Sequence, residues 1–177
     1  MNEEQARIRG YLVAQAAKLT PAAIVEKVQA AMADLRAAAA AVPPGRFAER
    51  PAPGEWSGNE VMAHVLAADL YFAGSIVSVL DGGPPLPRSD GRKSIEDAPA
   101  RPAEAWCRLL AEQRGALFTR VLAAPPTAAP DQRIEHPMFG PLSWRETLLF
   151  TRLHDLDHAG QLGKIAAALG AGAARPA

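Results

Sequence analysis

A long segment without proline, from Leu142 to Gly170, constrains the fold most strongly. Its apolar residues recur with helical spacing, so the sequence predicts a helix there. Residues four apart on a helix share a face, so His154 and His158 project side by side, with Gln161 one turn further along. Two imidazoles at this spacing can bind one metal ion. The same face is otherwise mostly apolar, which indicates that the pair points into a core; it also carries Thr147, Phe150, Thr151, Leu162, Ile165 and Leu169.

The histidine pair alone has an alternative interpretation, because two polar residues on a solvated helix face would show the same spacing. A metal ion usually needs a third protein ligand, and the sequence contains four histidines. His64 lies in the middle of a second amphipathic segment and is the candidate third ligand. His136 lies in a loop before a proline. We do not count it as a ligand, but it is a candidate pocket residue.

Composition excludes several classes of protein. Nineteen basic and nineteen acidic residues give a net charge of zero, and no basic cluster is long enough to follow a phosphate backbone, so we expect no nucleic-acid partner. The single cysteine, Cys107, excludes an internal disulfide and a cysteine-rich zinc site. The N-terminal residues lack the pattern of a signal peptide, and no run of 18 apolar residues occurs. We therefore expect a cytoplasmic protein with no membrane span.

Capping residues and prolines divide the chain into helices. Two capping boxes, Ser57 to Glu60 and Ser143 to Glu146, mark the starts of the helices that carry the histidines. Thr20 followed by Pro21 marks another helix start. The predicted helices cover residues 3 to 18, 20 to 42, 57 to 80, 102 to 123 and 143 to 170. A short extended piece is expected just before the last helix.

These segments predict an all-α fold, a four-helix bundle with a short extra N-terminal helix and with metal ligands that project inward. The linker from Gly82 to Asp97 is long enough to be a crossover that lets consecutive helices run parallel. The expected organisation is an N-terminal helical extension at 1–19, the bundle at 20–170 and a flexible tail at 171–177.

Three motifs resemble those of a known family. They are Trp56-Ser57-x-x-Glu60-Val61-x-x-His64, then His136-Pro137-Met138-Phe139-Gly140-Pro141-Leu142-Ser143, then His154-x-x-x-His158-x-x-Gln161. In this order they resemble the DinB-like superfamily of four-helix-bundle metalloproteins. The resemblance implies that His64, His154 and His158 bind a divalent metal, often zinc or nickel. It also implies frequent homodimers.

The activities that the resemblance implies are of several kinds. They include bacillithiol or mycothiol S-transferases, a thiol-dependent isomerase of the maleylpyruvate type and metal-dependent hydrolases. Three neutral imidazoles leave an open position on a divalent metal, so water or a thiol can be activated there. A low-molecular-weight thiol would be a cosubstrate, and no catalytic cysteine is then needed. Cys107 is expected to be a small core residue.

We predict a metal-dependent thiol S-transferase-like enzyme that acts on a small molecule. The alternatives are a metal-dependent hydrolase, a non-catalytic metal or small-molecule binding protein, and a helical interaction domain without a metal. Three polar residues could act on the ligand imidazoles: Gln161, Glu60 and Asp157. Each also has a simpler explanation, because Gln161 could cap a turn, Glu60 belongs to a capping box and Asp157 could lie on a solvated surface. Candidate pocket residues are Tyr71, Ser75, Phe150, Thr151 and His136.

Overall fold

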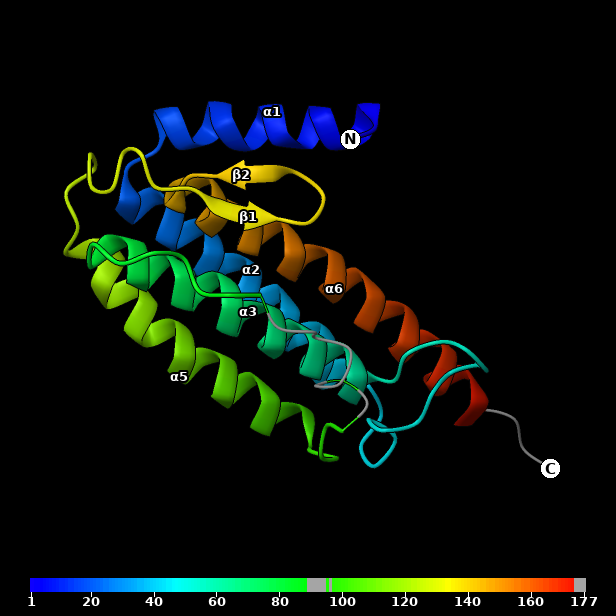
Figure 1. The fold of residues 1–177 in the computed structure, drawn as a ribbon. Coiled ribbons are helices and arrows are strands. Elements are labelled where there is room, and N and C mark those ends of the chain that lie inside the picture. Colours follow the sequence, from blue (N-terminus) through cyan, green and yellow to red (C-terminus); the bar gives the residue numbers. More distant parts are fainter. Residues whose placement is uncertain (89–94, 96, 174–177) are drawn as a thin grey trace.

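A computed structural model describes residues 1–88, 95 and 97–173, and this part of the chain is mainly helical (Figure 1). The predicted all-α class is confirmed. The last helix continues three residues beyond Gly170, and residues 174–177 of the expected tail lie outside the described residues. The elements are α1 (Glu3–Lys18), α2 (Pro21–Ala41), α3 (Gly58–Leu80), α5 (Ala103–Leu122), β1 (Ile134–His136), β2 (Gly140–Leu142) and α6 (Trp144–Ala173).

Four of the helices form the bundle. Helix α2 packs against α5 and α6, and α3 packs against the same two helices from the other side. Helices α3 and α5 begin at the same end of the molecule and run parallel, so the chain between them is a crossover (Figure 1). Its described part returns along α3, where Leu86 N donates to Ser75 Oγ at 3.1 Å. The rest of the predicted linker, residues 89–94 and 96, lies outside the described residues.

Side-chain caps fix where the two histidine-bearing helices begin. At the start of α3, Glu60 N donates to Ser57 Oγ at 3.2 Å and Ser57 N donates to Glu60 Oε2 at 2.8 Å. Before α6, Ser143 N donates to Glu146 Oε2 at 2.9 Å, and Glu146 N donates to Ser143 Oγ at 3.4 Å. These reciprocal bonds satisfy backbone donors that have no partner inside a helix. The caps therefore set the register in which residues of α3 and α6 face the core.

A short hairpin covers one part of the bundle, between α1 and the histidine-bearing helices (Figure 1). Strand β1 pairs antiparallel with β2, and His136 lies opposite Gly140. The φ of Gly140 is 69°, a left-handed conformation that favours glycine. Strand β1 packs on α3 and β2 packs on α6. The hairpin thereby brings His136 from a distant part of the sequence to the side of α3.

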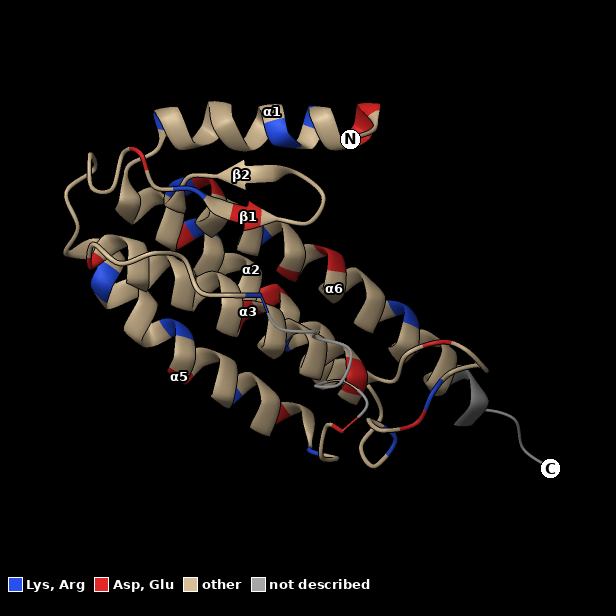
Figure 2. Cartoon of the chain, in the orientation of Figure 1, with Lys and Arg blue, Asp and Glu red and all other residues tan. Residues whose placement is uncertain are grey.

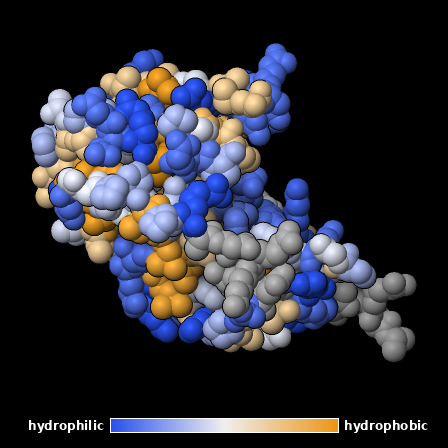
Figure 3. Space-filling model, viewed as in Figure 1, coloured by the Kyte–Doolittle hydropathy of each residue, from blue (hydrophilic) through white to orange (hydrophobic). Residues whose placement is uncertain are grey.

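Charged residues of both signs are scattered among uncharged ones over the drawn chain (Figure 2). Hydrophilic residues cover most of the face shown in Figure 3, with smaller apolar patches among them. Within the described residues, α3 is long and apolar enough to cross a membrane by length and composition alone. Half of its apolar window is buried in the bundle, and the buried core helix of a globular protein passes the same test.

Candidate metal centre

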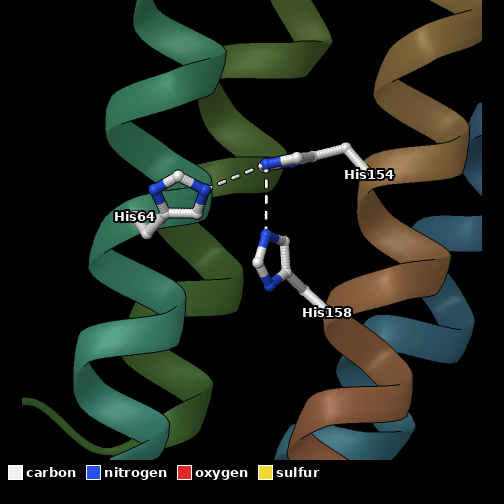
Figure 4. A group of neighbouring side chains, drawn as sticks. All are labelled: His64, His154 and His158. Atoms are coloured by element: carbon white, nitrogen blue, oxygen red, sulfur yellow. Dashed lines mark hydrogen bonds between the residues drawn. The ribbon is translucent and has the colours of Figure 1, made fainter. Parts of the chain in front are cut away.

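Three histidines from two helices converge inside the bundle. His64 lies on α3, and His154 and His158 lie one turn apart on α6 (Figure 4). The Nε2 atom of His154 lies 3.1 Å from Nε2 of His64 and 3.1 Å from Nε2 of His158. One ring nitrogen from each residue lies within 4.8 Å of the other two. The structure therefore brings together the three residues that the sequence predicts as ligands.

The contacts around the rings hold this arrangement. The His154 and His158 rings meet nearly edge to face, with centroids 4.4 Å apart and an interplanar angle of 79°. The Trp56 ring, just before the α3 cap, lies 5.2 Å from the His64 ring. Gln161 lies one turn after His158, and His158 Nδ1 donates to Gln161 Oε1 at 2.8 Å. The Nε2 atoms of the three rings face one shared centre (Figure 4).

The hydrogen positions on these rings favour a cation at that centre. Because His158 Nδ1 carries its proton toward Gln161, the neutral ring has only a lone pair on Nε2. If His154 Nε2 donates its one hydrogen to that lone pair, it has no second hydrogen and no lone pair for His64 Nε2. If His154 instead accepts from His64, two lone pairs face each other between His154 and His158. One short contact is therefore unsatisfied among three neutral rings, and a metal ion that receives all three lone pairs removes the conflict.

The electrostatic environment keeps the His64 and His154 rings neutral, which is the form that binds a metal. Burial, and secondarily the charge of His158, lowers the pKa of His64 to about 4. Burial also lowers the pKa of His154 well below its ordinary value, with the neighbouring histidines and Arg114 acting in the same direction. Protonation of His64 and of His154 in the metal-free centre is therefore disfavoured near neutral pH.

The other polar residues predicted near the ligands lie in different positions. Gln161 holds His158, as described above. The Glu60 carboxylate is bound to the α3 cap and to Arg50 Nε at 3.0 Å. Asp157 is exposed on α6 and lies at the rim of the cavity beside the histidines. Of the three, Gln161 is the one that contacts a ligand imidazole.

A cavity of about 400 Å³ adjoins the three histidines. Of the predicted pocket residues, Tyr71, Phe150 and His136 line it. Ser75 and Thr151 are buried but do not line the cavity. Ser75 Oγ accepts from Leu86 N of the linker, and Thr151 Oγ1 donates to Leu148 O at 2.7 Å. The lining also includes residues that we did not predict: Ala67, Ala68, Phe72, Arg88, Pro137 and Met138.

A buried charge cluster behind the histidines was not predicted. Arg114 of α5 donates through Nε to Asp69 Oδ1 of α3 at 2.9 Å and through Nη2 to Asp155 Oδ1 of α6 at 3.0 Å. The three residues are at most 2% exposed. Burial raises the pKa of Asp155, against the opposite effect of Arg114. Because Asp155 follows His154 directly, the cluster fixes the rotation of α6 at the ligands. A sequence signal existed, since Asp69 interrupts a largely apolar helix.

Cys107 lies away from the centre. It lines a separate groove between α2 and α5, with Met32 and Glu104 among its neighbours. Burial raises the pKa of its thiol, which favours the neutral form. Cys107 is therefore not placed to act as a nucleophile at the histidines.

Comparison with known proteins agrees with the geometry. A model of the DinB superfamily matches residues 27–162. This chain belongs to the DinB superfamily, and the predicted resemblance is confirmed. No curated protein and no solved structure matches it. The matched range contains all three histidines, which could hold a divalent metal ion of the kind that the family generally binds.

Proposed function

We propose that this protein binds one divalent metal ion through His64, His154 and His158 and uses it for catalysis. The convergence of three Nε2 atoms beside a cavity carries the proposal. Two imidazole nitrogens bound to one tetrahedral zinc ion lie about 3.3 Å apart, from metal–nitrogen distances of about 2.0–2.1 Å. The two contacts of 3.1 Å are close to that separation, and the nitrogens of His64 and His158 lie within 4.8 Å of each other.

Zinc or nickel is the proposed metal. Imidazole ligands suit both ions, whereas magnesium and calcium prefer oxygen ligands. Three protein ligands with a further position open to substrate are typical of catalytic rather than structural zinc. The cavity adjoining the histidines supplies that access.

The proposed reaction is the transfer of a low-molecular-weight thiol, of the bacillithiol or mycothiol type, to an electrophilic small molecule. When bound, the metal supplies a Lewis acid that favours the thiolate form of the thiol. A sulfur–carbon bond forms, the leaving group departs with its electron pair, and the thiol proton passes to solvent. The protein itself provides the cavity, in which Phe72, Phe150 and Met138 offer apolar surface to the electrophile.

The polar groups near the histidines favour thiol transfer over hydrolysis. Hydrolysis at a metal centre is assisted by a base that takes a proton from the metal-bound water. The Glu60 carboxylate is bound to its cap and to Arg50, and His136 Nδ1 accepts two backbone N–H groups. Asp157 is exposed at the rim. Among the described residues, no buried carboxylate lines the cavity to act as that base. A thiol cosubstrate brings its own nucleophile.

We also propose a homodimer that acts in the cytoplasm on a small molecule. Two-fold dimers are the commonest closed assembly, and alanine-rich helix faces allow close approach of helices. Such an interface should bury more than about 1,000 Å² in total. It should leave the cavity beside His64 open, because a centre without access could not bind a substrate.

A metal assay followed by a thiol panel tests the proposal. The protein as purified is analysed for bound metal, and turnover of monochlorobimane is then measured with bacillithiol, mycothiol and glutathione. His158→Ala should lose both the metal and turnover, while Lys164→Ala, an exposed change on the same helix, should keep them. Bound metal without turnover of any thiol would indicate a binding module. Absence of metal affinity would reject the proposal as a whole.

A further inference from the structure

His136 is a buried histidine whose hydrogen-bonding state is fixed by the hairpin. It is 4% exposed, and its Nδ1 accepts from Met138 N at 3.2 Å and from Phe139 N at 3.3 Å. An imidazole nitrogen that accepts hydrogen bonds carries no proton, so the neutral ring carries its proton on Nε2. Burial first, and the positive charge of Arg88 second, lowers the pKa of His136 to about 4. The ring is therefore a neutral donor near pH 7.

Aromatic side chains hold the His136 ring in one orientation. Phe139 stacks on it with centroids 4.5 Å apart, and Phe72 stacks at 5.4 Å. Phe150 meets it edge to face at 4.2 Å. His136 lines the cavity beside the metal ligands, and no acceptor within residues 1–88, 95 and 97–173 receives its Nε2–H. Because His136 lines the cavity, its Nε2–H is available to an acceptor on a molecule that enters it.

A cation lines the same cavity. Arg88 is exposed and lines this cavity together with His136 and Tyr71. Asp157 is the acidic residue of the lining, and it lies exposed on α6, the helix that carries two of the metal ligands. A fixed neutral donor and a cation therefore line the same cavity as one exposed carboxylate.

We propose that His136 and Arg88 form a subsite for a carboxylate group, so that the substrate of this centre is a small apolar molecule that carries a carboxylate. This inference rests on the proposed function, because it names the class of molecule that the metal centre acts on. One carboxylate oxygen accepts from His136 Nε2–H, and the guanidinium binds the group through a charge-assisted hydrogen bond. The apolar body of the molecule contacts Phe150 and Met138 and extends toward the three histidines.

Two substitutions at His136 separate its two hydrogen-bonding roles. In His136→Asn the side-chain oxygen can replace Nδ1 as the acceptor for the turn, but no donor reaches the position of Nε2. In His136→Gln the amide nitrogen can replace Nε2 as the donor, but the turn loses its acceptor. Arg88→Gln removes the charge at an exposed position and should leave the fold unchanged. Thermal unfolding of each variant records any effect on the fold.

Calorimetric titration with benzoate and with benzamide tests the subsite, in the chelator-treated protein and again after zinc loading. Benzoate should bind the chelator-treated wild type more tightly than benzamide. His136→Asn should weaken benzoate binding about tenfold, and His136→Gln should weaken it less. Arg88→Gln should weaken benzoate about tenfold and leave benzamide unchanged.

Other outcomes overturn the subsite. Equal binding of benzoate and benzamide to the wild type would show that the cavity does not recognise a carboxylate. Benzoate binding that requires zinc and is unchanged in His136→Asn and Arg88→Gln would place the carboxylate on the metal. The chelator-treated samples separate the two proposals: a protein that discriminates benzoate but never binds zinc would refute the proposed function and leave the subsite intact.

Discussion

Replacement of Arg114 by methionine should destabilise the protein strongly. Arg114 is 1% exposed, and it donates to two carboxylates from different helices, Asp69 and Asp155. Methionine has a similar length but no charge and no donor. Asp69 keeps its bond from Gln113 Nε2 at 2.6 Å, whereas Asp155 loses the donors that Arg114 supplies. The cost should therefore fall mainly on Asp155, which is fully buried on α6.

The magnitude follows from the burial of the cluster. Removing one partner of a buried ion pair typically costs about 3–5 kcal/mol, because the remaining charge has no compensation. For a domain of this size, 1 kcal/mol shifts Tm by about 2–4 °C. Arg114→Met should therefore lower Tm by roughly 6–20 °C. The same change in Arg120, whose partner Asp81 is exposed, should cost no more than about 1 kcal/mol.

The pH dependence identifies the cause. Burial already raises the pKa of Asp155, and the loss of Arg114 should raise it further. When a carboxyl has a higher pKa in the folded state, the folded protein loses stability as pH rises above the unfolded pKa of that group, about 3.9. The deficit of Arg114→Met should therefore be larger at pH 8 than at pH 5, and adding Asp155→Asn should recover part of it. Calorimetric Tm values at both pH values check this. A drop no larger than that of Arg120→Met would refute the reasoning.

Other predictions concern the centre and the assembly. His158→Ala should weaken zinc binding strongly while circular dichroism keeps its helical signal, because apolar burial dominates folding; chelation that unfolds the protein would contradict this. Gln161→Leu should weaken zinc binding by about 10–100-fold, measured by competition with a chelating dye. The stability that His136 contributes is present above pH 6.5 and is lost as pH falls toward its folded pKa of about 4. Between pH 6.5 and 4 the free energy of unfolding should therefore fall less steeply in His136→Asn than in the wild type, by up to about 1.4 kcal/mol per pH unit. Tm values over this window check this. Light scattering should give about twice the chain mass of 18.7 kDa, and a monomer would reject the dimer.

Local signals in the sequence predicted the helices and the three histidines. The capping boxes at Ser57 and Ser143 depend on residues three apart, so their geometry does not need the rest of the fold. The pairing of His154 with His158 follows from helical spacing in the same way. His64 required one further assumption, that its helix lies opposite the last one. That assumption held because both helices bury an apolar face in the same core.

Contacts between distant segments could not be read from the sequence. Arg114 meets Asp155 across 41 positions and Asp69 across 45, and many helix pairings would be compatible with those three residues. The donor role of His136 depends on the ring orientation that Phe72, Phe139 and Phe150 impose in three dimensions. A loop histidine before a proline gives no sign of that orientation. The end of α6 also differed, because Gly170 can continue a helix when no proline follows directly.

X-ray absorption at the zinc edge tests the central claim most directly. The chelator-treated protein is loaded with one equivalent of zinc, and the wild type is compared with His64→Ala. The wild type should show three imidazole nitrogens at about 2.0–2.1 Å and one further light ligand. His64→Ala should lose one imidazole. A wild-type spectrum without three imidazoles, or one that His64→Ala leaves unchanged, would contradict the claim that these three histidines form a metal centre.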